Sequence, residues 1–190
     1  GGYRNVVVKV VTQGKLADGY RLTSISVNPP SVTVFSSDPQ KVDALPGYIE
    51  TIPVILDNLK SDLIIPIELN LPEGITLVGL QQISVQASIE SIESSLTISR
   101  IPVEIFGLKD GLSASVAPEA VDIIFSGPLP LLDALKASDI QVTVDLNNYL
   151  PGTYQVEPIV VVTSEEIKIE SILPETIEVM IQSSVPTPTP

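Results

Sequence analysis

The amino-acid sequence of 190 residues contains no cysteine and no histidine, and aromatic residues make up only 4% of it. Without cysteine the chain forms no disulfide and offers no thiolate for catalysis or metal binding. Without histidine it lacks the commonest general base and the commonest zinc ligand. A Ser-His-Asp triad is therefore excluded.

Positive charge is also scarce, with 10 Lys and Arg against 23 Asp and Glu and a net charge of −13. The imbalance is uneven: residues 1–100 hold seven basic and ten acidic residues, whereas residues 101–190 hold three and thirteen. An acidic surface repels phosphate backbones, which argues against nucleic acid as a partner. We interpret the excess acid as a solvated surface, with a docking surface for a basic partner or for cations as the alternative.

Long hydrophobic runs are missing as well, since no apolar stretch approaches the roughly 20 residues that cross a bilayer as a helix. The chain begins with GGYRN and has neither an initiator Met nor a signal peptide. We therefore expect it to be a piece of a longer protein.

What the sequence does contain is an internal repeat. Residues 19–35 are GYRLTSISVNPPSVTVF and residues 111–125 are GLSASVAPEAVDIIF. Both begin with Gly, pass through small polar residues to a Val, and have a Pro two residues later. An alternating β-branched pair follows in each: Val32 and Val34 in the first, Val121 and Ile123 in the second.

The repeat continues on both sides of this phrase, so a unit of about ninety residues, a usual size for one domain, occurs twice. We predict two domains, residues 1–92 and residues 93–183, arranged end to end because the connection SIESSLTISR is short. The tail of residues 184–190, SVPTPTP, indicates an extended Pro/Thr-rich linker.

The apolar residues alternate with a period of two in short β-branched stretches such as SVTVF, ISVQASI and TIEVMI. This pattern predicts all-β domains, each with a mixed twisted sheet. Two stretches break the pattern at equivalent places, near residues 39–45 and 128–136, and each has an early Pro. We predict one short helix per domain, with Leu45 and Leu135 as the core contacts.

The repeated phrase resembles the YbbR-like domain family, which occurs as tandem repeats in bacterial cell-surface proteins. The resemblance covers nearly the whole chain, although the second repeat lacks the Gly-Tyr start, and its motifs are structural, so they identify fold better than function. The matching residues in the first repeat are Gly19, Tyr20, Val27, Pro30, Val32, Val34, Pro39, Asp57 and the Leu71–Ile75 turn; in the second they are Val103, Pro118, Val121, Ser126–Pro128, Asp145, Pro174 and Val179.

The resemblance implies a role. The best-known members are regulators of the CdaR type, which have an N-terminal membrane helix and several YbbR-like repeats outside the membrane. They pair with a membrane-bound diadenylate cyclase and modulate cyclic di-AMP synthesis. By this resemblance the chain corresponds to interior repeats of such a protein at the cell surface, and no regulatory residue is transferred to it.

Two carboxylates on predicted strands, Asp122 and Asp145, form the sharpest enzymatic hypothesis, because glycosidases place such a pair across a cleft. A chain with 23 acidic residues offers many such pairs by chance. Neither residue lies in a recognisable motif, and no Gly-rich phosphate loop links a strand to a helix. We therefore assign no catalytic residue and no cofactor.

Asp and Asn residues also cluster at two equivalent turns. Oxygen ligands on a loop are what Ca²⁺ requires, but Asp and Asn form ordinary turns through bonds to their own backbone. No spacing matches an EF-hand loop, so we predict turns, assign no metal ligand and keep calcium as the alternative. The residues are Asp57, Asn58 and Asp62 in the first repeat and Asp145, Asn147 and Asn148 in the second.

The few aromatic residues favour packing over recognition. Phe35 and Phe125 occupy nearly equivalent places, and we predict that both fill the core. A stacking platform would need several rings on one face, and the five tyrosines are scattered through predicted loops and strand ends. They are Tyr3, Tyr20, Tyr48, Tyr149 and Tyr154.

The absence of a catalytic motif favours a binding module, and the resemblance implies a regulatory one outside the cytoplasm, with a diadenylate cyclase or cell-wall polymers as partners. A structural spacer without regulatory activity is the alternative, and a surface hydrolase is a third hypothesis. A binding module should present an exposed apolar or charged patch larger than a monomer usually tolerates, whereas a spacer should have evenly polar sides.

Overall fold

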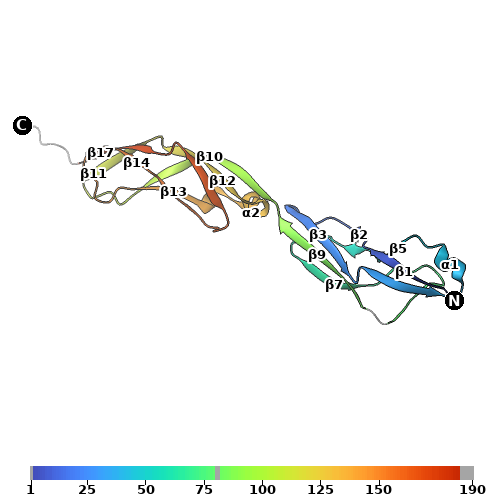
Figure 1. Ribbon diagram of the computed structural model, residues 1–190. Coiled ribbons are helices and arrows are strands. Elements are labelled where there is room, and N and C mark those ends of the chain that lie inside the picture. Colours follow the sequence, from blue (N-terminus) through green and yellow to red (C-terminus); the bar gives the residue numbers. More distant parts are fainter. Residues whose placement is uncertain (1, 80–81, 185–190) are drawn as a thin grey trace, which may run out of the picture. The chain divides into compact units, whose positions relative to one another are not determined.

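The computed structural model describes residues 2–79 and 82–184 (Figure 1). The chain folds into two compact units, Gly1–Ile92 and Glu93–Pro190, here called unit 1 and unit 2. Most of the predicted Pro/Thr-rich linker, residues 185–190, lies outside the described residues.

Unit 1 contains a four-stranded sheet of order β5-β1-β4-β8, a three-stranded sheet of order β3-β9-β7 and the small pair β2-β6. A single short helix, α1, follows β4. The elements are β1 (Gly2–Lys9), β2 (Thr12–Gln13), β3 (Tyr20–Asn28), β4 (Ser31–Ser36), α1 (Pro39–Asp43), β5 (Tyr48–Glu50), β6 (Val54–Ile55), β7 (Leu63–Ile67), β8 (Thr76–Leu77) and β9 (Ile83–Ser91).

Unit 2 contains a five-stranded sheet of order β15-β13-β10-β12-β16 and a three-stranded sheet of order β11-β17-β14. A short helix, α2, and a 3₁₀ turn, η1, follow β12. The elements are β10 (Glu93–Phe106), β11 (Leu112–Ala117), β12 (Ala120–Pro128), α2 (Leu129–Ala134), η1 (Ala137–Asp139), β13 (Ile140–Asp145), β14 (Gly152–Val156), β15 (Ile159–Val162), β16 (Lys168–Leu173) and β17 (Ile177–Ser183).

The all-β fold class with mixed sheets, predicted from the period of two, is confirmed. In unit 1, β1 pairs with β4 in the antiparallel sense and with β5 in the parallel sense. In unit 2, β10 pairs in the same two ways with β12 and β13. The two units therefore share a strand arrangement, and positions in one sheet can be matched to positions in the other.

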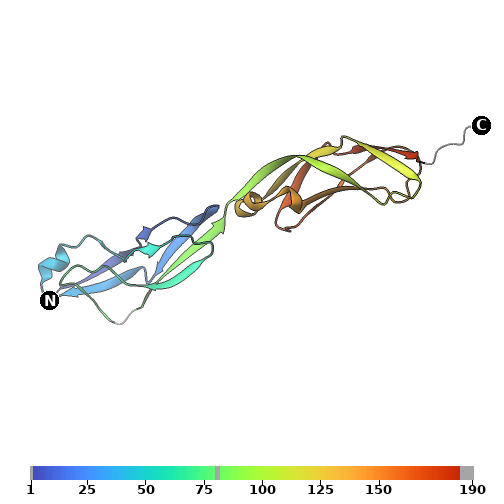
Figure 2. The same ribbon diagram turned by 180° about the vertical axis from the view of Figure 1, so that it is seen from behind.

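The two helices lie where the alternation breaks. Helix α1 begins with Pro39, whose fixed φ suits a first helical position, and the carboxylate of Asp38 accepts a hydrogen bond from the backbone N–H of Gln40. In Figures 1 and 2, α1 lies beside the start of β1. Leu45 is buried and Leu135 packs against the core, as predicted.

The helices also supply core residues that the sequence pattern did not single out, Val42 in α1 and Leu132 in α2. Arg4 holds the end of α1 in place, because its guanidinium donates to the carbonyl oxygens of Val42 at 3.1 Å and Leu45 at 2.6 Å. These carbonyls lie at and just beyond the helix C-terminus, where Arg4 adds a side-chain donor to the bond that the N–H of Leu45 donates to Val42.

Each core lies between the facing sheets of its unit. In unit 2 a single cluster joins strands of both sheets: its buried members include Val121, Ile123 and Phe125 of β12, Val142 and Val144 of β13, and Ile177, Val179 and Ile181 of β17. In unit 1 the buried residues form two clusters, which share Val27 and Ile67 as partly buried neighbours.

The two phenylalanines do not play the same part. Phe125 is completely buried in unit 2, as predicted, but Phe35 is only half-buried and stacks on exposed Tyr3. The prediction that Phe35 fills the core is therefore wrong. Matching Val34 to Ile123 places Phe35 opposite Ile124 and not opposite Phe125, and a shift of one residue moves a strand side chain to the other face of the sheet.

We predict that Phe125→Ala lowers the free energy of unfolding of unit 2 by roughly 3–5 kcal/mol, because it leaves a cavity in a close-packed core. Phe35→Ala should cost unit 1 only about 1 kcal/mol, the size of an exposed aromatic pair. Urea unfolding followed by circular dichroism, with hydrogen exchange to assign the loss to a unit, measures both. Equal losses would contradict the placement of Phe35 outside the core.

Candidate binding surface

The two candidate catalytic carboxylates serve the backbone. Asp122 on β12 accepts a hydrogen bond from the N–H of Arg100 at 2.9 Å, where β10 is irregular and Arg100 has a φ of 60°. Asp145, at the end of β13, accepts from the N–H of Asn147 at 2.9 Å. Each carboxylate thus stabilises a local backbone conformation.

The candidate calcium residues hold backbone in place, and Asp57 and Asp62 do so across long separations in the sequence. The carboxylate of Asp57 accepts from the N–H of Lys15, and that of Asp62 accepts from the N–H of Ile89. Asn58 and Asn148 have positive φ values of 58° and 66°, a conformation that Asn tolerates better than most residues. Within residues 2–79 and 82–184, no three acidic side chains are grouped closely enough to hold a metal ion.

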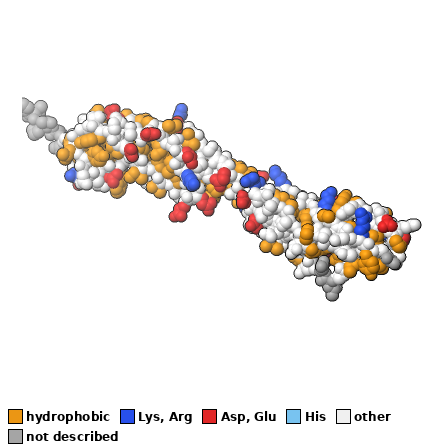
Figure 3. Space-filling model, viewed as in Figure 1, with side chains coloured by type: hydrophobic (Ala, Val, Ile, Leu, Met, Phe, Trp, Pro, Cys, Tyr) orange, Lys and Arg blue, Asp and Glu red, His pale blue; other side chains and the backbone are white. Residues whose placement is uncertain are grey.

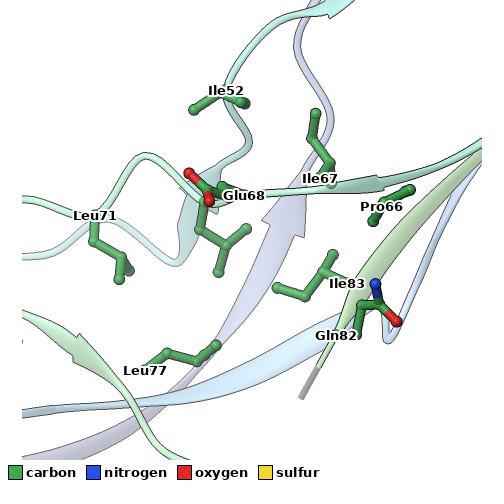
Figure 4. Close-up of a pocket in the computed structure, with 9 residues that line it drawn as sticks. Ile52, Pro66, Ile67, Glu68, Leu71, Leu77, Gln82 and Ile83 are labelled. Atoms are coloured by element: carbon green, nitrogen blue, oxygen red, sulfur yellow. The ribbon is translucent and has the colours of Figure 1, made fainter. Parts of the chain in front are cut away.

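Unit 1 contains a pocket of about 620 Å³ at the ends of β7, β8 and β9 (Figure 4). Its wall is apolar apart from the carboxylate of Glu68 and the amide of Gln82. A lining made mostly of apolar side chains suits an apolar ligand group. The apolar lining consists of Ile52, Pro66, Ile67, Leu69, Leu71, Leu77 and Ile83.

A second feature of unit 1 is the outer face of its four-stranded sheet, here called the aromatic face. Tyr3 of β1 is 69% exposed, and its ring centroid lies 4.8 Å from that of Phe35, its cross-strand partner on β4. Val7 of β1 is 56% exposed and is paired with Tyr48 of β5. The aromatic face comprises Tyr3, Asn5, Val7, Thr33, Phe35 and Tyr48.

Sequence reasoning missed this face. Tyr3, Phe35 and Tyr48 belong to three strands that the register brings together, and their spacing along the chain gives no hint of it. The exposed side of β1 did carry a signal, since Tyr3, Asn5 and Val7 alternate with inward-facing residues. A second aromatic pair, Tyr149 and Tyr154, forms an edge-to-face contact in unit 2, and Tyr154 donates to the carbonyl of Leu150.

The two units also differ in charge. Unit 2 holds four basic and fourteen acidic residues, whereas unit 1 holds six and nine. Figure 3 shows Lys and Arg side chains along the visible face of unit 1, and mainly Asp and Glu on that of unit 2. An electrostatic attraction to a cationic partner would therefore act mainly on unit 2.

The fold defines a protein built of mixed-β units, with one short α-helix described in each. The model of the YbbR-like protein family matches residues 6–89. The chain belongs to the YbbR-like family, as its repeated phrase predicted.

The known relatives cover different shares of the chain. The CdaA regulatory protein CdaR of Bacillus subtilis is 25% identical over 157 residues, which cover 81% of this chain and 32% of that protein. The chain thus spans 32% of the length of the curated relative that it matches. Among solved structures, the YbbR-like domain of a Listeria monocytogenes protein is 32% identical, with a TM-score of 0.46, and covers 50% of this chain and 99% of that domain.

A YbbR family protein from Desulfitobacterium hafniense is 20% identical, with a TM-score of 0.36, and covers 47% of this chain and 96% of that protein. In the part of the chain that the structure describes, no helix has the length and hydrophobicity to cross a membrane.

The hydrogen bond from the N–H of Lys15 to the carboxylate of Asp57 leads to a prediction that distinguishes a structural role of Asp57 from a calcium site. Asp57→Ala should lower the free energy of unfolding of unit 1 by about 1 kcal/mol, because the N–H of Lys15 loses its acceptor. Asp57→Asn should retain most of that stability, since an amide oxygen still accepts the bond. Thermal unfolding with added calcium or with a chelator measures the effect, and a transition that the chelator lowers in the parent chain would favour calcium instead.

Proposed function

We propose that the chain is a non-catalytic regulatory module that acts outside the cytoplasm, as part of a membrane-anchored CdaR-like protein, and modulates a membrane-bound diadenylate cyclase. The observation that carries this proposal is the similarity to CdaR of Bacillus subtilis, which is named as a regulatory protein of CdaA. The cyclase, the location and the membrane anchor come from what the family resemblance implies.

The proposal includes the domain organisation. Residues 1–92 and 93–183 would be YbbR-like repeats 1 and 2, followed by a linker over residues 184–190. The match of the family model to residues 6–89 supports the first repeat, and the shared strand order of the two units supports the second.

A module without catalytic groups can change an enzyme's activity only by binding its conformations or assemblies with unequal affinity. The acidic surface of unit 2 supports an ionic contribution to such binding, because exposed charges are screened beyond about 10 Å at 0.1 M salt. The proposed partners are the cyclase and, for anchoring or sensing, cell-wall polymers.

We predict that cells whose full-length protein lacks residues 1–183 have a cyclic di-AMP level different from that of cells with the intact protein, and that external salt changes the difference. Cyclic di-AMP is measured by mass spectrometry in both strains, with immunoblots to match the amounts of anchored protein. The salt series tests the ionic contribution of unit 2.

A third strain provides the control for a spacer. It carries an unrelated pair of β domains of the same length in place of residues 1–183. If this replacement restores the normal level across the salt range, or if the deletion has no effect, the chain acts as a spacer and the regulatory proposal is wrong.

A further inference from the structure

On the aromatic face of unit 1, the ring of Tyr3 is exposed to solvent and also contacts the ring of Phe35 on the neighbouring strand. Tyr3 and Phe35 face each other across β1 and β4, with their rings tilted by 45° at a centroid distance of 4.8 Å. Tyr3 is 69% exposed, while Phe35 is half-buried. The contact with Phe35 restricts the ring of Tyr3, so a ligand that stacks on it loses little side-chain entropy.

Polar groups interrupt the apolar ones along the face. The next outward pair after Tyr3 and Phe35 is Asn5 with Thr33, and Val7 follows, paired with Tyr48 on its other side. From Tyr3 to Val7 the strand rises by about 14 Å. The face thus presents a ring, then an amide and a hydroxyl, then a second apolar group.

None of the six residues of the aromatic face is charged. Beyond Val7 and Tyr48 the same side of the sheet continues with Lys9 and Glu50, which lie 3.9 Å apart as an ion pair. Arg4, the remaining charged residue of β1, β4 and β5, binds the carbonyls of Val42 and Leu45. The ammonium of Lys9 also lies 4.8 Å from the centroid of the Tyr48 ring. In a chain with a net charge of −13, this neutral face is suited to a neutral ligand.

We propose that the aromatic face binds a neutral saccharide chain, with one sugar ring stacked on Tyr3 and sugar hydroxyls bonded to Asn5 and Thr33. A sugar ring presents C–H groups on its faces and hydroxyls at its edges, which matches the order of groups along β1. A protein partner would find no continuous apolar centre here, because Asn5 and Thr33 divide the patch. This inference concerns binding alone and does not depend on the cyclase.

Unit 2 supplies an internal comparison. The pairing of Val6 with Val32 corresponds to that of Ile101 with Val121, and across the irregularity in β10 the pairing of Arg4 with Val34 corresponds to that of Ile98 with Ile123. One residue further along, Thr97 and Ile124 therefore stand where unit 1 has Tyr3 and Phe35. In the parallel pair, Gln141 stands where unit 1 has Tyr48, since Ile49 matches Val142. The same sheet therefore exists without the aromatic groups, and binding should be confined to unit 1.

The test uses the full chain and two neutral probes, oligomers of N-acetylglucosamine and of β-1,4-linked glucose, with oligogalacturonate as an anionic probe. Titration followed by amide NMR shifts should show at least one neutral probe binding, with the shifts confined to β1, β4 and β5. Tyr3→Thr and Tyr48→Gln introduce the residues of unit 2. Tyr3→Thr should weaken binding about tenfold or more, the scale of one lost stacking contact, and Tyr48→Gln should have a smaller effect.

Thr97→Ala combined with Gln141→Ala is the matched control on unit 2 and should leave binding unchanged, and circular dichroism verifies that each variant is folded. Binding of neither neutral probe, binding that survives Tyr3→Thr, or preference for the anionic probe would overturn the proposal. Sedimentation of the parent chain and of Tyr3→Thr at rising concentration tests a different occupant. If the parent chain self-associates and Tyr3→Thr does not, the aromatic face binds a second copy of the chain and the saccharide proposal is wrong.

Discussion

The burial of one face of the central strands, such as β1, β4, β12 and β17, in the core is the interaction on which both units depend. Strand β1 buries Val6 and Val8, β4 buries Val32 and Val34, and each such side chain contributes roughly 1.5–3 kcal/mol when removed from water. The backbone hydrogen bonds then fix the partner of each strand, because few buried backbone groups remain unpaired. Register, helix position and turn contacts all follow from keeping these residues inside.

The same constraint leaves the outer faces free to differ. Once the inward residues hold the sheet, an outward side chain needs only to be compatible with the extended conformation of a strand. Residues as different as Tyr3 in unit 1 and Thr97 in unit 2 can therefore occupy matching places. The distribution of charge shows the same freedom, with most of the acid excess in unit 2. One fold therefore presents two chemically different surfaces in a single chain.

These differences connect the fold to the proposed role. A module that regulates by contact needs surfaces of distinct chemistry on a stable scaffold, and the two units provide a neutral aromatic face and an acidic one. The carboxylates that suggested catalysis are engaged elsewhere, since Asp122 and Asp145 accept hydrogen bonds from backbone N–H groups. The scaffold thus uses polar side chains to hold irregular backbone and leaves the outer faces of its sheets exposed.

The sequence by itself determined the fold class, the two helices and most of the strands, because these depend on local alternation and on Pro positions such as Pro39. It also identified the family, through a phrase that recurs along the chain. Tertiary structure alone decided that Tyr3, Phe35 and Tyr48 share one face and that Phe35 lies outside the core. Cross-strand register joins residues far apart in the chain, and a one-residue difference in register reverses the face of a side chain, which no local pattern reveals.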